Sequence, residues 1–196
     1  MQKNEIINLA LYAGILKNVN RQGWVLKGIE DPESVADHTF RTAFLVMILS
    51  NDHPKLNQAR MIKMALIHEI GESVVGDIVY EHGENIISPL VNKHKDERNA
   101  LMEIFKTMSG KQEYIDLWEE WVAQETPEAK YVKCVEKLEM VIQAYEYEQK
   151  GHKPELFEEF WKNAWKYIRD SELEPILTEL ESMRKKKKGK KGASWY

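Results

Sequence analysis

The fold is decided by the stretch MIKMALIHEIGE at residues 61–72. Its apolar residues cover most of the circumference of a helix, which predicts a helix over residues 57–71 with a buried second half. His68 and Glu69 lie within that buried half, and Glu72 lies just beyond it. Side chains three or four positions apart share one region of a helix surface. We therefore expect an imidazole and two carboxylates to lie close together in the core.

These three ionisable side chains are unfavourably placed unless something neutralises them. Neighbouring carboxylates raise each other's pKa, and a buried carboxylate is normally paired, bound to a metal or protonated. A lysine or arginine could act as the partner, but the sequence has none within four residues of Glu69. A divalent cation would resolve the conflict, so the stretch predicts a metal site.

The rest of the chain also shows the periodicity and the end signals of helices. Asp31-Pro32-Glu33 and Thr126-Pro127-Glu128 each have the order of an N-cap, a first-turn proline and a first-turn acid. Gly110 and Gly151 stand where glycine commonly ends a helix, and no stretch alternates as a β-strand does. We predict an all-α protein with one helical bundle, its helices at about residues 4–17, 33–51, 57–71, 90–109, 112–124, 127–150, 154–169 and 172–187.

Composition is typical of a soluble globular protein. The chain has 196 residues, of which 43% are hydrophobic and 31% are charged, and this size suits one compact domain. The longest apolar run, residues 43–49, is too short to span a bilayer, and the N-terminus lacks the pattern of a secretory leader. Cys134 is the only cysteine, so no intramolecular disulfide can form. We expect a cytoplasmic protein that does not enter the membrane.

Charge is distributed unevenly along the chain. Residues 184–191 hold seven basic and no acidic side chains, and the remainder has 21 basic and 32 acidic residues, a net charge of −11 against −4 for the whole chain. An acidic body disfavours general nucleic-acid binding. The basic segment has the composition to bind RNA or an acidic partner, but a solvated end is the simpler interpretation. We assign residues 1–183 to the domain and residues 184–196 to a flexible tail.

Three further polar residues interrupt apolar surroundings in the same way as the first cluster. They are His38, Asp77 and Glu136. Imidazole and carboxylate ligands together suit a borderline divalent metal that keeps a water ligand, as a hydrolytic site requires. Each residue also has a simpler interpretation, because a lone histidine is more often a core residue and Asp77 can cap a turn. Glu136 can form ordinary helix ion pairs with its neighbouring lysines, or Glu139 can take its place as a ligand.

Several separate motifs, in this order, resemble the HD-domain superfamily. They are ADHT at residues 36–39, HEIGE at 68–72 with GD at 76–77, and KCVEKLE at 133–139. Within the superfamily the chain is similar to the short 5′-deoxynucleotidase branch. The likeness extends from about Leu9 to Lys150 and includes NVNRQGW at 18–24 and ETPEAK at 125–130.

The resemblance implies an HD-domain helical bundle that holds a divalent cation (Mn, Co, Mg, Zn or Ni). The four ligand positions of the branch correspond here to His38, His68, Glu69 and Glu136. The branch has aspartate where Glu69 and Glu136 stand, and each exchange lengthens the ligand by one methylene, about 1.5 Å of reach. We expect the cation to be retained with these longer acids.

The resemblance also implies roles in the reaction and a partner. Glu72 corresponds to the acid that handles the proton of the attacking water or the leaving oxygen, and Arg21 to a residue that holds the phosphate. Asp77 corresponds to a residue near the sugar, and Trp24 is a looser match that would pack against the nucleoside. The expected substrates are (deoxy)ribonucleoside 5′-monophosphates, and family members commonly form homodimers. The alternatives are a non-catalytic nucleotide-binding protein and an HD phosphohydrolase that acts on another nucleotide or a phosphodiester.

Overall fold

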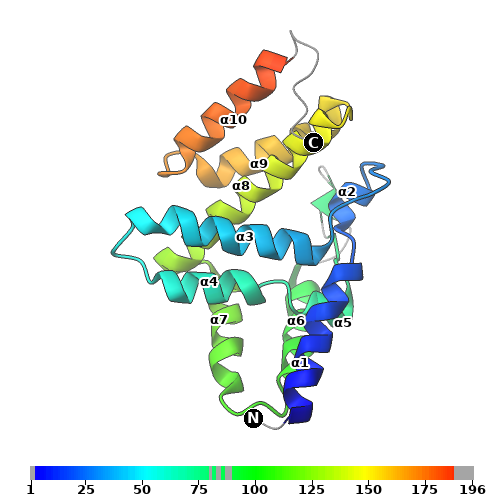
Figure 1. Ribbon diagram of the computed structural model, residues 1–196, viewed down its shortest axis with the longest axis vertical. Coiled ribbons are helices and arrows are strands. Elements are labelled where there is room, and N and C mark those ends of the chain that lie inside the picture. The colour runs from blue at the N-terminus through cyan, green and yellow to red at the C-terminus, as the bar shows by residue number, and fades with distance from the viewer. Residues whose placement is uncertain (1–2, 80, 83–84, 87–89, 188–196) are drawn as a thin grey trace. The chain divides into compact units, whose positions relative to one another are not determined.

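The computed structural model describes residues 3–79, 81–82, 85–86 and 90–187 of the chain. These residues are almost entirely helical (Figure 1), which confirms the all-α prediction. The one addition is a short antiparallel pairing of β1 (Glu81–His82) with β2 (Asn85–Ile86), which has no alternating pattern long enough to predict it. The chain forms two compact units, residues 1–132 and residues 133–196, which we call the first and the second unit.

The first unit contains the HEIGE motif and helices that pack around it. α4 packs against α3 and α7, while α5 packs against α6 and α1. The buried apolar side chains of this unit include Trp24, Val46, Met61, Met64 and Leu101. Its helices are α1 (Lys3–Ile15), α2 (Gln22–Val25), α3 (Val35–Leu49), α4 (Gln58–Ile67), α5 (Glu72–Val75), α6 (Leu90–Ile104), α7 (Lys111–Ala123) and the start of α8 (Pro127–Gln149).

The second unit contains the rest of α8, α9 (Glu158–Ile168) and α10 (Glu174–Lys187). Arg184 anchors α10, because its guanidinium donates to the carboxylates of Glu148 and Glu158 and lies over the ring of Trp161. Residues 184–187 therefore form the end of a helix, which corrects their assignment to a flexible tail. Residues 188–196, the remainder of the predicted tail, lie outside the described residues.

Several helix ends differ from the sequence-based prediction. α3 begins after Ser34 rather than at Asp31, because Ser34 and Asp37 form a capping box in which each side chain bonds the other's backbone N–H. Gly110 caps the start of α7 instead of ending the preceding helix. At the end of α8 the prediction is correct, since Gly151 has a φ of 102° and follows the last helical turn.

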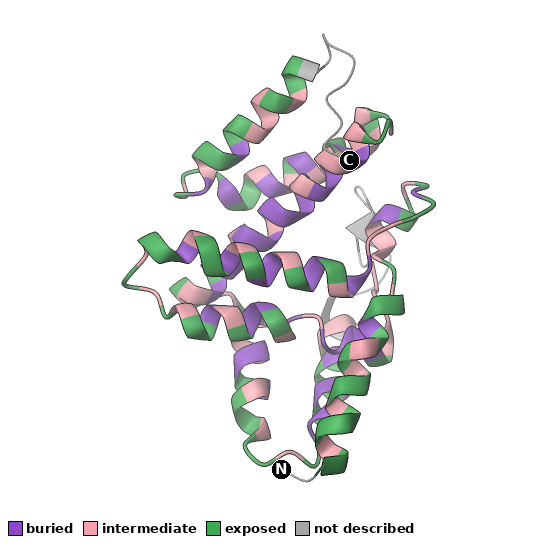
Figure 2. Cartoon of the chain, in the orientation of Figure 1, coloured by how far each residue is buried: buried purple, intermediate pink, exposed green. Residues whose placement is uncertain are grey.

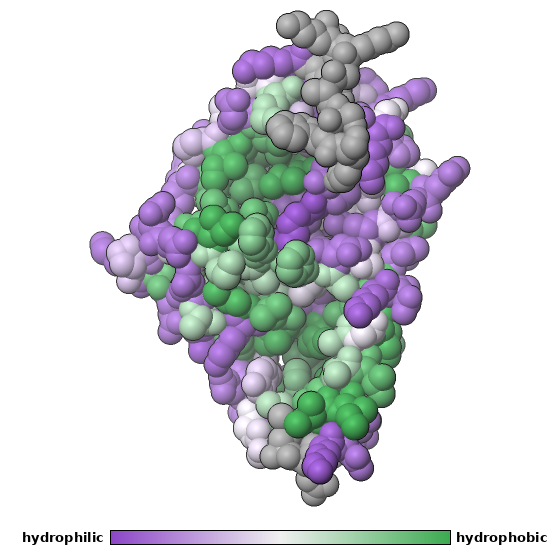
Figure 3. Space-filling model, viewed as in Figure 1, coloured by the Kyte–Doolittle hydropathy of each residue, from purple (hydrophilic) through white to green (hydrophobic). Residues whose placement is uncertain are grey.

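The N-terminal helix α1 leaves several large apolar side chains in solvent. None of the residues of α1 is buried (Figure 2). Ile6, Ile7, Leu11 and Ile15 are 42–62% exposed, and apolar residues gather over this helix in Figure 3. Among the described helices, none combines the length and the apolar composition that crossing a membrane requires.

Candidate metal centre

The turn between α4 and α5 carries the ionisable residues of the HEIGE motif. The helix predicted to reach residue 71 ends at Ile67, and tight backbone bonds follow, with the Ile70 N–H on the Ile67 carbonyl and the Glu72 N–H on the Glu69 carbonyl. The turn packs closely on α6. A Cβ at Gly71 would lie 3.1 Å from Leu101 Cδ1. This packing overrides the helical pattern of the sequence and turns His68 and Glu69 toward α3.

Two buried histidines come together from different helices. His38 is 0% exposed in the first turn of α3, and His68 is 2% exposed at the end of α4. Their ring centroids are 5.5 Å apart. His68 Nδ1 lies 2.7 Å from the Ala65 carbonyl oxygen, which can only accept, so Nδ1 carries the proton. In the neutral ring Nε2 therefore offers its lone pair.

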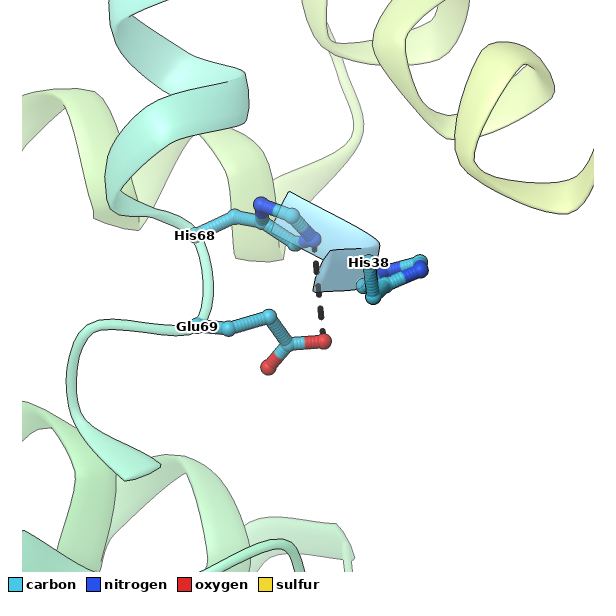
Figure 4. A group of neighbouring side chains, drawn as sticks. All are labelled: His38, His68 and Glu69. Carbon is cyan, nitrogen blue, oxygen red and sulfur yellow. Dashed lines mark ion pairs between the residues drawn. The ribbon is translucent and has the colours of Figure 1, made fainter. Parts of the chain in front are cut away.

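Glu69 completes a group of three possible ligands with these histidines (Figure 4). One ligand atom from each of His38, His68 and Glu69 lies within 4.8 Å of the other two, and the His68 Nε2 to Glu69 Oε1 distance is 3.6 Å. Two imidazole nitrogens and one carboxylate oxygen form a donor set that suits a borderline divalent cation. The residues present thus fit the cation that the sequence predicts.

Glu136 lies in the second unit, on α8. Its carboxylate is buried and is paired with two lysines, Lys133 Nζ at 2.7 Å and Lys137 Nζ at 3.1 Å. The ion-pair interpretation of the sequence is therefore realised in the structure. Glu139, the alternative ligand, is also fully buried. A metal-binding role for either acid stays a prediction.

Arg21 lies beside Glu69, and Asp77 lies beside Arg21. Arg21 NH1 lies 3.3 Å from Glu69 Oε1 and 3.9 Å from Asp77 Oδ2. Asp77 also accepts the Gln22 N–H at 2.7 Å and so caps the start of α2, 55 residues earlier in the chain. Gly76 has a φ of 77°, a conformation that favours glycine, and this bend ends α5 immediately before Asp77.

Trp24 does not offer a free face in this structure. Its side chain is buried, with 2% of the residue exposed, and its indole N–H donates to Glu33 Oε1 at 2.8 Å. The ring packs in the core beneath the segment that carries Arg21. The predicted contact with a nucleoside would therefore require the ring to become exposed.

The structure adds Lys93 and Glu97, which sequence reasoning missed. Lys93 Nζ lies 3.2 Å from Glu72 Oε1 and 3.3 Å from Glu97 Oε1. The sequence offers only the weak signal of a lysine and a glutamate four positions apart on one helix. Nothing in the sequence links these residues to Glu72, which lies on another helix. Lys93 and Arg21 are thus the cationic partners that the sequence did not provide near Glu69.

The charges and burial in this cluster shift the pKa values of Glu69 and Glu72 in opposite directions. Burial opposes ionisation of Glu69, but neighbouring positive charges, including those of Lys93 and Arg21, outweigh it and lower the pKa of that carboxyl. Burial, together with the charges of Glu69 and Asp77, raises the pKa of Glu72 well above its ordinary value. Burial also raises the pKa of Glu97 to about 7, although Lys93 opposes the shift. One acid is held as a carboxylate, and its neighbour binds a proton more readily.

Comparisons with known proteins cover most of the chain. An HD-domain family model matches residues 13–187. The chain is 37% identical over 173 residues to human 5′-deoxynucleotidase HDDC2, covering 87% of this chain and 82% of that protein. It is 41% identical over 150 residues to 5′-deoxynucleotidase HDDC2 of Dictyostelium discoideum, covering 72% and 77%. A conserved hypothetical protein from Pyrococcus furiosus has a similar solved structure, with a TM-score of 0.72, 36% identity, and coverage of 91% and 99%.

Proposed function

Because the chain belongs to the HD-domain family, we propose that it is a metal-dependent 5′-nucleotidase that releases phosphate from (deoxy)ribonucleoside 5′-monophosphates. The relatives that share 37–41% of its sequence are named 5′-deoxynucleotidases. The observation that carries the proposal is the buried group of His38, His68 and Glu69 with Arg21 directly beside it. A cation site next to a guanidinium can receive a phosphate group.

The metal would be held by His38, His68 and Glu69 of the first unit. The family resemblance supports Glu136 as the fourth ligand, which would exchange its lysine partners for the metal. When bound, a divalent cation supplies Lewis acidity, which lowers the pKa of water and neutralises phosphate charge. Among the expected metals, Zn, Co and Ni suit this mixture of nitrogen and oxygen ligands better than Mn and Mg, which favour oxygen ligands.

Arg21 and Glu72 would act on the substrate itself. Arg21 remains charged, because the carboxylates of Asp77 and Glu69 outweigh burial and raise its pKa. Its guanidinium can make a bidentate contact with the phosphate and stabilise the charge that builds up as the ester bond breaks. Glu72 would take a proton from water and return it to the departing 5′-oxygen. Asp77, beside Arg21, would lie near the sugar.

We also propose that the protein acts as a cytoplasmic homodimer. The exposed apolar side chains of α1, Ile6, Ile7, Leu11 and Ile15, support association, because contiguous apolar surface commonly marks an interface. Cys134 as the only cysteine supports a reducing compartment. Sedimentation velocity of the purified protein tests the oligomeric state.

Phosphate release is the direct test of the proposed activity. Purified protein supplied with Mn²⁺ or Co²⁺ is expected to release inorganic phosphate from deoxyribonucleoside 5′-monophosphates, and a chelator is expected to stop the reaction. The substrate panel includes 3′-monophosphates, ribonucleotides and a phosphodiester. Absence of phosphate release from every 5′-monophosphate would overturn the proposal, and hydrolysis of the diester alone would favour another HD phosphohydrolase.

A non-catalytic nucleotide-binding protein is the second candidate, favoured by Glu136 and its two lysine partners. Elemental analysis and the double variant Glu69→Asp/Glu136→Asp distinguish the two functions. For an enzyme, we expect the wild type to contain metal and the double variant to keep kcat/KM within about tenfold. A metal-free, inactive wild type that gains both metal and activity in the double variant would favour the second candidate.

A further inference from the structure

We propose that Lys93 is a positioning residue that fixes the carboxylate of Glu72 for proton transfer and is itself held by Glu97. This inference rests on the proposed function and deepens it. It assigns a task to Lys93, which is partly buried, and to the buried Glu97, two residues of α6 that neither bind the cation nor contact the substrate in the proposed reaction.

The contact with Glu72 involves only one of its two oxygens. Lys93 Nζ lies 3.2 Å from Oε1. Oε2 is buried and has no hydrogen-bond partner among the described residues. Because the Glu72 side chain is 1% exposed and the Lys93 side chain 13%, water screens this ion pair little. The lysine therefore fixes the carboxylate plane through one oxygen and leaves the other to exchange a proton.

Glu97 is a second carboxylate partner of the lysine. It lies one helical turn after Lys93 on α6, and its Oε1 is 3.3 Å from Lys93 Nζ. A lysine has a flexible four-carbon stem with costly rotamer freedom, so a single contact positions it poorly. Ion pairs with two buried carboxylates, those of Glu72 and Glu97, restrict the ammonium group more than one ion pair would.

The backbone keeps this arrangement tight. A Cβ at Gly71 would lie 3.3 Å from both the Cβ and the carbonyl oxygen of Glu97, so the turn before Glu72 lies directly on α6. Glycine at this position lets the two segments approach closely enough for a lysine of α6 to reach Glu72.

The charges of the surrounding acids also support a positioning role for Lys93. Glu69, Glu72 and Glu97 each place one oxygen within 4.8 Å of the other two. Such a group of acids repels itself unless a cation intervenes. Lys93 contacts two of the three, and Arg21 contacts the third. Removing the lysine would leave Glu72 and Glu97 to repel each other, and the carboxylate of Glu72 would lose its fixed orientation.

The test compares Lys93→Met, Lys93→Arg and Glu97→Gln with the wild type, and uses Lys106→Met as a control. Lys106 forms an exposed ion pair with Glu103.

We expect Lys93→Met to lower kcat about 10- to 100-fold, the scale of a misplaced catalytic group. KM, metal content and the inhibition constant of inorganic phosphate should stay within about twofold, because the ligands and Arg21 remain. Lys93→Arg should recover most of kcat, and Glu97→Gln should lose less than Lys93→Met.

A double-mutant cycle with Glu72→Gln separates positioning from a general structural effect. In the Glu72→Gln background, Lys93→Met should change kcat by less than about twofold, because residues that act as a unit are not additive. Full additivity, a Lys93→Met variant with wild-type kcat, or a loss of metal in place of kcat would overturn the inference while the proposed function stands. A wild type that releases no phosphate would overturn both. If Lys93→Met fails to fold, the Lys93→Arg and Glu97→Gln variants carry the same comparison.

Discussion

Replacing Glu72 with glutamine is expected to lower kcat about 10²- to 10⁴-fold, the usual contribution of a general acid–base group. Glutamine keeps the size of the side chain and an oxygen that can accept from Lys93, which lies 3.2 Å from Glu72 Oε1. It cannot take a proton from water. Metal content should therefore be unchanged, and the loss should appear in kcat, as measured by steady-state phosphate release.

Glu103→Gln is the matched control for this substitution, because Glu103 is exposed and forms an ion pair with the surface residue Lys106. Its kcat should equal that of the wild type. A Glu72→Gln variant that retains more than about a tenth of the wild-type kcat would contradict an acid–base role for this residue. Loss of metal in that variant would instead make Glu72 a ligand.

Replacing His68 with alanine is expected to remove nearly all bound metal and to lower kcat/KM at least about 10³-fold, since the Lewis acid would be lost. The Ala65 carbonyl fixes the His68 tautomer through Nδ1, and the centroids of the His68 and Trp121 rings are 4.9 Å apart. Elemental analysis and phosphate release measure the two effects on the same sample.

His152→Ala is the control for the histidine substitution, since the His152 ring packs edge-on against Tyr147 in the second unit. It should keep its metal and its activity. His38→Ala should behave as His68→Ala does, because both rings belong to the same ligand group. Full metal content in both His38→Ala and His68→Ala would show that the cation binds elsewhere.

The sequence predicted the helical class because apolar periodicity and caps are local signals. It did not predict where helices end when packing decides the boundary. The pattern through residue 70 continues as a helix, yet α4 ends at Ile67, because the following turn packs on α6 around Gly71. Ser34 likewise is the N-cap of α3 in place of the predicted Asp31, since its reciprocal capping box with Asp37 satisfies two backbone donors.

In the candidate site, too, the sequence predicts residues that belong to local motifs but not residues that only tertiary packing brings in. His38, His68 and Glu69 could be selected from their apolar surroundings and motif order, and the structure brings these three together. Lys93 could not be selected, because its contact with Glu72 depends on how α6 packs beside the turn. A search for a counter-charge limited to neighbours in sequence misses partners that the tertiary fold supplies.

The carboxylate of Asp77 has a consequence for how this protein can change over evolutionary time. It closes the start of α2 through the Gln22 N–H and lies beside Arg21. If Asp77 lies near the sugar and Arg21 binds the phosphate, as proposed, a substitution of Asp77 that alters which sugar is accepted would also release the segment that presents Arg21. A change of substrate preference at Asp77 would thus also destabilise the local structure. New specificity should arise more readily at side chains that do not also stabilise the fold.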